Sequence, residues 1–524
     1  MATTTIENPF AQGVTQDRAT QPAQLVIFGA TGDLTKRKLL PAVYNLAQAQ
    51  LLPPGFCMVG FSRDDSCNDE TFRKRLSDAV ATSGDVREQD AAVLADLSAR
   101  SYYLSGDFHD PQCYAQLKAK LAELDPKYGT AGNRIFYIAT PASLFGDIVQ
   151  QLHDAGMINP SSVVGQASPA QSPPFTRIIV EKPFGRDLAS AKQLNTEMLR
   201  YLGEDQIYRI DHYLGKETVQ NILVFRFANG VFEPIWNRRY VDHVQITVAE
   251  SLGIEGRASF YEETGVVRDV IQNHALQLLS LVAMEPVTSF DATDFRDEKV
   301  RVVKAVRPIA PQDVDKFAVR GQYGPGFITG ADAVGYRQEP EIAPDSATPT
   351  YAAFKFVVDN WRWAGVPFYV RSGKRLAKRV TEIVMQFKQA PHLPFRNAQI
   401  SELEGNILAL RIQPDEGITL KFGAKVPGPS MRIRSVNMDF GYGATFGRED
   451  SSPYERLILD CMKGVQTLFD RSDGVEAAWA LIDPVLTAWA AKPPANFPNY
   501  AAGSWGPPEA DKLLADDGRE WRRL

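Results

Sequence analysis

The sequence predicts a two-part fold of the α/β plus α+β class. An amino-terminal parallel sheet with helices on both faces is followed by a larger part, in which helices cover a mostly antiparallel sheet. Two observations predict this order. Over roughly the first 200 residues, short apolar runs alternate with stretches of helical periodicity. Beyond about residue 205, apolar runs follow one another closely, and few helices between them are long enough to return the chain in parallel.

The amino-terminal part begins with a buried strand at residues 24–29, which a helix at residues 32–48 follows. The strand is a single apolar run, and the helix carries apolar residues at helical spacing. The same order of strand and helix continues along the chain, as in a parallel sheet. Further strands are expected at residues 56–63, 133–140 and 177–183.

The carboxy-terminal part contains a series of short apolar runs with β-branched and aromatic residues, which favour strands. Two amphipathic helices, at residues 265–282 and 454–469, are expected to cover the resulting sheet. The strands are expected at residues 243–250, 300–306, 350–359, 367–373, 382–388, 406–412 and 417–422.

These patterns divide the 524 residues into three segments. Residues 1–22 are polar and predict a flexible arm, residues 23–204 form the first domain, and residues 205–524 form the second. The stretch at residues 161–174 is rich in Ser, Pro, Gln and Ala. We interpret it as a surface loop inserted before the strand at residues 177–183.

Charge and composition are those of an ordinary globular protein. The chain has 57 Lys and Arg against 63 Asp and Glu, a net charge of −6, with 44% hydrophobic and 23% charged residues. This balance disfavours non-specific binding to nucleic acids or anionic membranes. No apolar run approaches the ~18 residues of a membrane span, and the first residues lack an apolar segment behind a basic one. We therefore expect a soluble, cytoplasmic protein.

The cysteines form no CxxC pair, so the sequence indicates neither a zinc site nor a disulfide scaffold. This pattern favours a reducing compartment. A redox pair of Cys57 and Cys67 stays open, although two idle thiols are the commoner arrangement. The four cysteines are Cys57, Cys67, Cys113 and Cys461.

A glycine-containing loop at residues 29–35 lies where the first strand turns into the first helix. Its backbone amides and the helix N-terminus are suited to hold a pyrophosphate, as in Rossmann-like domains. The spacing is GxxGxxT, with Thr35 in place of the third glycine of the commoner GxGxxG. A plain turn from strand to helix would also need such glycines, but the strand before the loop favours a dinucleotide.

The end of the second strand carries Arg63 where many such domains have an acidic residue that binds the ribose 2′-hydroxyl. An arginine there suits the 2′-phosphate of NADP, because its planar fork pairs with phosphate. Asp64 follows directly, so use of NAD stays open. An ordinary solvated charge at a strand end is the alternative interpretation of Arg63.

His274 lies on the apolar side of the helix expected at residues 265–282. Taken alone, such a residue is more often a hydrogen-bonded core histidine than a catalyst. A catalytic role requires a carboxylate that fixes its tautomer, and Asp269, five positions away, lies off its face in an α-helix. The partner must then come from another element. The apolar residues around His274 are Val267, Val270, Ile271, Leu278 and Leu281.

Residues 209–216, RIDHYLGK, concentrate an aspartate, a histidine, a tyrosine and a lysine. In an extended segment, Asp211 and His212 would point in opposite directions and serve different tasks. His212, Tyr213 and Lys216 offer donors suited to a phosphate dianion, which leaves Asp211 to orient a base. A solvated turn with mixed charges fits the same composition.

The segment RIDHYLGKETVQNI closely resembles the active-site signature of the glucose-6-phosphate dehydrogenase family. Four further motifs of that family accompany it in the same order, from about Val26 to past Gly417. A chance match of five ordered motifs is not credible. The four are GATGDLTKRKLLPAVYNL, IIVEKPFGRDLASA, TVAESLGIEGRASFYEETGVVRDVIQNHALQLL and FYVRSGKRL.

The resemblance implies NADP-dependent oxidation of glucose 6-phosphate at C1 to 6-phosphogluconolactone, the first step of the oxidative pentose phosphate pathway. His274 matches the family's general base, and Asp211 matches the carboxylate that holds its imidazole. Arg379 matches less surely than the other substrate residues, because the spacing after RSGK can drift. Residues that match substrate contacts are Lys182, His212, Tyr213, Lys216, Glu250, Asp269, Lys374 and Arg379.

The resemblance also assigns the cofactor residues. Gly29, Thr31, Gly32, Asp33 and Leu34 match the pyrophosphate loop, Arg63 matches the 2′-phosphate contact, and Lys182 matches a lysine that reaches both substrate and cofactor. No metal is expected, since oxidation of a cyclic hemiacetal hydroxyl requires none and no HExxH, CxxC or Walker motif is present. The family's habit implies a homodimer or homotetramer.

Two other functions stay open at this point. One is a related oxidoreductase of the glucose–fructose oxidoreductase and inositol dehydrogenase type, acting on an unphosphorylated sugar or polyol, although that type lacks the RIDHYLGK cluster. The other is a non-catalytic, NADP-binding regulatory homologue. Loss of the base or of the phosphate-binding residues would favour it, and none of these residues is lost.

Overall fold

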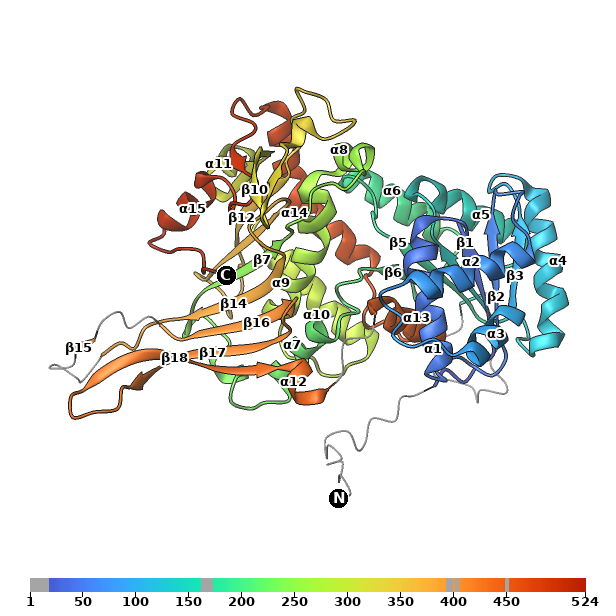
Figure 1. The fold of residues 1–524 in the computed structure, drawn as a ribbon, viewed down its shortest axis with the longest axis horizontal. Helices are drawn as coiled ribbons and strands as arrows, with labels where there is room; N and C mark the ends of the chain where they lie inside the picture. The colour runs from blue at the N-terminus through green and yellow to red at the C-terminus, as the bar shows by residue number, and fades with distance from the viewer. Residues whose placement is uncertain (1–17, 162–172, 393–398, 401–404, 448–451) are drawn as a thin grey trace, which may run out of the picture.

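The fold is that of a computed structural model, which describes residues 18–161, 173–392, 399–400, 405–447 and 452–524. Its first sheet has six parallel strands in the order β3-β2-β1-β4-β5-β6 (Figure 1). Because helices cover both faces, these strands are apolar and buried along nearly their whole length. They are β1 (Ala23–Phe28), β2 (Phe56–Ser62), β3 (Ser101–Ser105), β4 (Arg134–Ile138), β5 (Thr176–Glu181) and β6 (Ile207–Ile210).

Side chains of β1 alternate between two cores, one on each face of the first sheet. Leu25 and Ile27 join the core beneath the first helices, whereas Val26 and Phe28 join the core on the opposite face. The helices of this part are η1 (Thr35–Leu39), which is π-helical, α1 (Leu40–Gln48), α2 (Asp69–Thr82), α3 (Ala91–Ala99), α4 (Pro111–Tyr128), α5 (Phe145–Asp154) and α6 (Leu188–Leu199).

The second sheet has nine strands in the order β15-β18-β17-β16-β14-β7-β13-β12-β8. Its neighbours pair antiparallel, except that β7 runs parallel to β13 and β15 runs parallel to β18. The predicted fold class is therefore confirmed. The strands are β7 (Val241–Ala249), β8 (Ala318–Gly321), β12 (Tyr351–Val357), β13 (Pro367–Gly373), β14 (Val380–Phe387), β15 (Gln399–Ile400), β16 (Ile407–Gln413), β17 (Gly417–Lys425) and β18 (Arg432–Gly441).

Helices pack on one face of the second sheet and also link it to the first. β7 packs against the helical segment that carries His274, while α13 packs on α1, and α14 packs on α6 and α10. One continuous core therefore contains side chains of both sheets. The helices are α7 (Glu217–Phe227), α8 (Ala258–Val266), the π-helical η5 (Val267–Ala275), α9 (Leu276–Ala283), α10 (Ala292–Ala305), α11 (Val314–Phe317), α12 (Tyr442–Phe446), α13 (Pro453–Lys463), α14 (Ser472–Ala491) and α15 (Pro508–Ala515).

Short elements complete the described part of the chain. Two small sheets pair β10 with β11 and β9 with β19. None of the described helices has the length and apolar character needed to cross a lipid bilayer. The remaining elements are β9 (Tyr323–Gly324), β10 (Gly326–Ile328), β11 (Ala331–Ala333), β19 (Tyr500–Ala501) and the 3₁₀ turns η2 (Ala142–Leu144), η3 (Glu204–Gln206), η4 (Glu233–Ile235), η6 (Pro311–Asp313) and η7 (Tyr336–Gln338).

Two predicted elements differ from the structure. The strand predicted at residues 300–306 is wrong, because this stretch continues α10, whose buried side chains recur at helical spacing from Phe295 to Val303. Three valines in the last turns gave the segment a strand-like composition. The helix predicted at residues 454–469 is too long, since α13 ends at Lys463 where Gly464 adopts φ +79°.

Features near the predicted domain limits add detail. β6 lies beyond the boundary predicted at residue 204, yet it pairs with β5 as the last strand of the first sheet. A boundary after β6 would keep that sheet whole. Of the predicted arm, residues 1–17 lie outside the described residues, but Ala19 is buried and donates its N–H to Leu51. Within the predicted insertion, residues 162–172 lie outside them as well.

Candidate active site

The carboxyl ends of the parallel strands gather the residues that the sequence singles out. Loops leaving β1, β2, β5 and β6 carry Gly29, Arg63, Lys182 and Asp211, and all four strands end at the same edge of the sheet. Ligands of open parallel sheets bind at this edge. β2 and β6 are four strand spacings apart, about 19 Å at the usual ~4.8 Å between strands. An elongated ligand can therefore span the edge.

The glycine loop is closed by its own hydrogen bonds. Gly29 has φ +79°, and a Cβ there would lie 2.6 Å from the carbonyl oxygen of Ala139, so only glycine fits. The N–H of Gly32 and the hydroxyl of Thr35 both donate to the Gly29 carbonyl, at 2.9 and 3.1 Å. Thr35, in place of a third glycine, thus tightens the turn. The Thr31 hydroxyl lies 2.9 Å from that of Ser62 at the end of β2.

The start of the first helix exposes charged groups beside this loop. Asp33 forms a surface ion pair with Arg37 at 2.8 Å, and Leu34 is half-buried just before η1. At the end of β2, Arg63 is exposed, with its guanidinium 5.8 Å from the centre of the Phe108 ring. The structure thus places the predicted cofactor residues along one side of the edge.

Asp64, the alternative ribose ligand, is already engaged. Its carboxylate accepts hydrogen bonds from the Ser66 hydroxyl at 2.5 Å and from Arg75 at 3.1 Å. The Ser66 hydrogen bond holds the pKa of this carboxyl below its usual value. Binding a ribose 2′-hydroxyl would compete with these contacts, whereas Arg63 is exposed.

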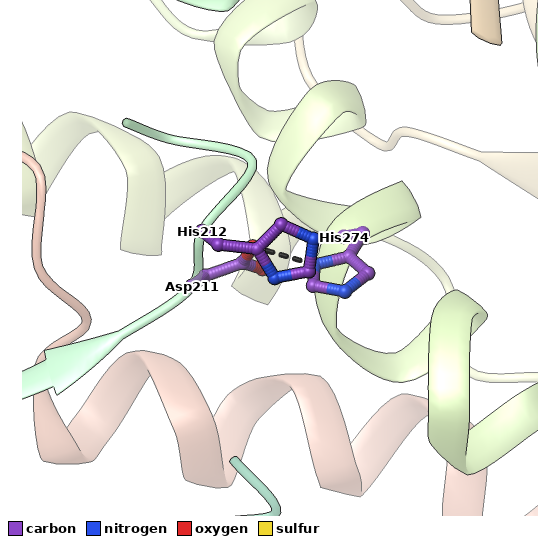
Figure 2. A group of neighbouring side chains, drawn as sticks. All are labelled: Asp211, His212 and His274. Atoms are coloured by element: carbon purple, nitrogen blue, oxygen red, sulfur yellow. Dashed lines mark hydrogen bonds and ion pairs between the residues drawn. The ribbon is translucent and has the colours of Figure 1, made fainter. Parts of the chain in front are cut away.

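At the other end of the edge, Asp211 and His274 form a buried hydrogen bond (Figure 2). His274 Nδ1 lies 2.5 Å from Asp211 Oδ1, and the two residues are 3% and 2% exposed. Asp211 Oδ1 also accepts the backbone N–H of Tyr213, which closes a turn after β6. Because a carboxylate only accepts, His274 carries its proton on Nδ1, and Nε2 is left as the acceptor of a further proton.

The segment after β6 is a turn, so the expectation for an extended segment does not apply. Asp211 and His212 lie on the same side, next to His274, as Figure 2 shows. The His212 ring centre is 4.4 Å from that of His274, and the Tyr213 ring stacks on His274 at the same distance. The turn carries mixed charges, but it is buried rather than solvated. Asp211, His212 and His274 each place a possible ligand atom within 4.8 Å of the others, yet the Asp211–His274 hydrogen bond accounts for two of them without an ion.

A π-helical segment explains how Asp269 contributes to the same site. The sequence predicts an α-helix, in which Asp269 would lie off the face of His274. In η5 the backbone bonds run from i to i+5, so residues five apart follow one another along one face. Burial, then the charge of Lys182, hold the pKa of His274 well below its usual value, while Asp269 opposes them. The imidazole is therefore neutral and able to accept a proton at neutral pH.

Two lysines and two carboxylates form a network beside the dyad. Lys182 Nζ donates to the carbonyl and the carboxylate of Asp269, at 2.7 and 3.1 Å. Lys374, 2% exposed, forms an ion pair with Glu250 and lies 3.8 Å from Asp269. Burial alone would raise the pKa of Asp269, but the two ammonium groups hold it well below its usual value. These polar groups suit a ligand rich in hydroxyls.

A second polar cluster lies on the opposite side of Tyr213. The Tyr213 hydroxyl is 3.3 Å from that of Thr381, and Lys216 Nζ donates to the side-chain oxygen of Gln413 at 2.5 Å. Arg379 is exposed and acts electrostatically on Tyr213. Cationic and hydroxyl donors thus converge here, as an anion such as a phosphate requires.

Sequence reasoning missed several residues of this site. Thr381 and Gln413 lie on β14 and β16, where they look like ordinary strand residues. Tyr137 donates to Glu181 at 2.5 Å, and burial raises the pKa of Glu181 to about 7. Only Glu181, which precedes Lys182 in a quoted motif, had a sequence signal that pointed to it.

Comparison with known protein families gives the same assignment over nearly the whole chain. Residues 26–221 match the family model described as "Glucose-6-phosphate dehydrogenase, NAD binding domain", and residues 223–522 match "Glucose-6-phosphate dehydrogenase, C-terminal domain". A glucose-6-phosphate 1-dehydrogenase of Chlamydia pneumoniae is 46% identical over 514 residues, 98% of either chain. A glucose-6-phosphate 1-dehydrogenase 2 of Mycobacterium bovis is 47% identical over 508 residues, 97% of this chain and 95% of that one.

Solved structures agree. A glucose-6-phosphate dehydrogenase in complex with its substrate glucose 6-phosphate superposes with a TM-score of 0.84 at 33% identity, covering 96% of this chain and 99% of that one. A glucose-6-phosphate 1-dehydrogenase of Mycobacterium avium gives a TM-score of 0.79 at 36% identity, with the same coverage. The fold, the ordered motifs and the buried Asp211–His274 pair are thus explained together: the chain belongs to the glucose-6-phosphate dehydrogenase family.

Proposed function

We propose that the protein oxidises glucose 6-phosphate at C1 and transfers the hydride to NADP, yielding 6-phosphogluconolactone. The observation that carries this is the buried hydrogen bond between His274 and Asp211 in a member of this family. His274 Nε2 takes the proton of the C1 hydroxyl while the C1 hydrogen leaves as hydride for C4 of the nicotinamide, so a carbonyl forms at C1. Asp211 keeps the imidazole in the tautomer that accepts this proton.

The two polar clusters would divide the substrate between them. His212, Tyr213, Lys216 and Arg379 would bind the phosphate, since cationic and hydroxyl donors meet there. At the sugar, the hydroxyls would be bound by Lys182, Glu250, Asp269 and Lys374. An unphosphorylated sugar would leave the phosphate donors unpaired, which costs far more than a missing methylene.

For the cofactor, the NAD binding domain match supports a nicotinamide dinucleotide, and we propose NADP as the preferred one. The pyrophosphate would lie against Gly29, Thr31, Gly32, Asp33 and Leu34, at the N-terminal end of the first helix. Arg63 would pair with the 2′-phosphate, and the engaged carboxylate of Asp64 would compete poorly for the hydroxyl of NAD. When bound, the cofactor supplies the hydride acceptor.

A homo-oligomer, dimer or tetramer, would make use of an exposed part of the second sheet. β17 and β18 carry several exposed apolar side chains, including Met438 at 62% and Val436 at 40% exposure. Light scattering on the purified protein measures this directly, and a monomer at micromolar concentration would contradict it. We also assign the protein to the cytoplasm, because its four cysteines are unpaired and three of them are buried.

The experiment that tests the function follows nicotinamide absorbance on mixing the pure protein with glucose 6-phosphate and NADP. Parallel reactions contain glucose in place of the phosphorylated sugar, NAD in place of NADP, or the His274→Asn variant. We expect turnover that requires the phosphate, prefers NADP and collapses in the variant. A folded protein that binds NADP without turnover would instead favour the non-catalytic regulatory homologue.

A further inference from the structure

A buried ion pair lies directly behind the Asp211–His274 dyad. Lys299 of α10 has its Nζ 3.5 Å from Oδ1 of Asp470, which lies just before α14. The two residues are 6% and 7% exposed. Removing two charges from water is expensive, so a buried pair is weak evidence for stability and calls for another explanation.

Asp470 connects the elements that carry the dyad. Its backbone N–H donates to the carbonyl of Arg209, in the strand that ends two residues before Asp211. Its carboxylate accepts a hydrogen bond of 2.8 Å from Gln277, three residues after His274. Through Lys299, Asp470 also joins α10. A displacement of this carboxylate would therefore be felt by both halves of the dyad.

The charge of Asp211 is balanced through space. Its Oδ1 is occupied by His274 and the Tyr213 backbone, whereas its buried Oδ2 has no hydrogen-bond partner among the described residues. Burial raises the pKa of Asp211, while the nearby charges of His212, Lys182 and Lys299 lower it. Lys182 belongs to the substrate site, so Lys299 is the ammonium that the proposed chemistry does not use.

Asp470 acts in the opposite sense. Burial raises its pKa to about 6, the charge of Lys299 lowers it, and the charge of Asp211 raises it. Arg209 and Arg296 are the other cations near this pair, and Glu181 is a further carboxyl near Asp211. Asp211 therefore lies between a cation that favours its ionised form and an anion that disfavours it.

We propose that Lys299 and Asp470 are positioning residues that set the pH range over which the Asp211–His274 dyad can accept a proton. Lys299 keeps Asp211 ionised, and Asp470 limits that effect and fixes Lys299 in place. Neither residue touches substrate, cofactor or a reacting atom. The inference rests on the proposed function, because it concerns the base of that reaction.

The test is the pH dependence of kcat/KM for glucose 6-phosphate in Lys299→Met and Asp470→Asn. At low pH the dyad holds a proton and activity falls. Without the Lys299 ammonium, the dyad retains this proton to higher pH, so the acidic limb moves up by roughly 1 pH unit. Without the Asp470 charge, Lys299 acts unopposed and the limb moves down. The double variant, which loses one charge of each sign, returns towards the wild-type limb.

Control variants separate this role from a merely structural one. Lys299→Arg keeps the positive charge and should keep the wild-type limb. Lys355→Met removes an ion pair with Asp517, remote from the dyad, and should lower thermal stability without moving the limb. Lower activity at every pH with an unmoved limb in both test variants would overturn the proposal.

A second measurement keeps the inference testable if a variant folds poorly or the proposed reaction fails. The imidazole signal of His274 can be titrated by NMR in labelled protein, since the chain has only six histidines. We expect opposite displacements of its apparent pKa in Lys299→Met and Asp470→Asn. Turnover by the wild type that is lost in His274→Asn supports the proposed function whatever the two variants do. Equal titrations in all three proteins refute the role of Lys299 and Asp470 alone.

Discussion

Single residues decide whether His274 can serve as a base. Burial and the charge of Lys182 keep its imidazole neutral, and the bond to Asp211 leaves Nε2 as acceptor. Neither helical spacing nor composition could find this partner, which lies 63 residues earlier in the chain. The resemblance pointed to it because both residues lie in long, specific motifs. Lys299 and Asp470 lie in none of these motifs and became visible only in three dimensions.

Replacing Asp211 by Asn tests the orienting role. The amide has nearly the shape of the carboxylate, but its NH₂ group can donate to Nδ1 and so favour the wrong tautomer. We expect kcat to fall by roughly 10²–10⁴-fold, with little change in the KM for glucose 6-phosphate. Steady-state kinetics at the optimal pH measure both. A loss below tenfold would mean that Asp211 does not hold the base.

Replacing Lys216 by Ala tests the phosphate site. The loss of one charge-assisted hydrogen bond, about 1.5–3 kcal/mol, should raise the KM for glucose 6-phosphate by roughly 10–100-fold. The KM for NADP should stay constant. Lys388→Ala, which removes an exposed lysine bonded to the Arg238 carbonyl, is the control. An unchanged KM for the sugar in Lys216→Ala would favour an unphosphorylated substrate instead.

At the scale of elements, periodicity was a good guide wherever an element buries a single face. The strands of the first sheet and the helix at residues 32–48 were found because apolar runs and helical spacing are local properties. The strand predicted at residues 300–306 failed because valines in a helix and in a strand look alike over seven residues. The π-helical geometry of η5 has no sequence signal at all, yet it changes which residues share a face with His274.

The glycine loop offers a prediction at this scale. Gly29→Ala would place a Cβ 2.6 Å from the Ala139 carbonyl oxygen in a backbone with φ +79°, so the loop must shift. We expect the KM for NADP to rise at least tenfold while the secondary structure is kept, measured by kinetics and circular dichroism. Gly230→Ala, where a Cβ meets nothing within 4 Å, should leave KM unchanged. Equal values in the two variants would exclude this loop from the cofactor site.

At the scale of the whole molecule, the two sheets share one core, and late elements complete early ones. Trp479 of α14 is 1% exposed and donates its indole N–H to the carbonyl of Phe184 at 2.9 Å. That carbonyl lies two residues after Lys182 of the candidate site. The sequence predicted both sheets, but not this return of the chain, since packing between distant segments leaves no local pattern.

Trp479→Ala tests that union. Removing a buried indole should destabilise the protein by about 3–5 kcal/mol, seen as a lower midpoint of thermal unfolding. Trp361→Ala is the matched control, because Trp361 is 97% exposed and its loss should leave the midpoint within error. Similar midpoints for both variants would show that α14 contributes little to holding the two sheets together.

The packing of α13 and α14 on the first sheet also has a consequence for protein synthesis. The ribosome makes the glycine loop, β6 and Asp211 in the first half of the chain, and His274 soon after the midpoint. The helices that cover β6 and bring Asp470 to it are made among the last residues. A nascent chain that has already translated both members of the dyad therefore still lacks their support, and enzyme activity should begin only around the time of chain release.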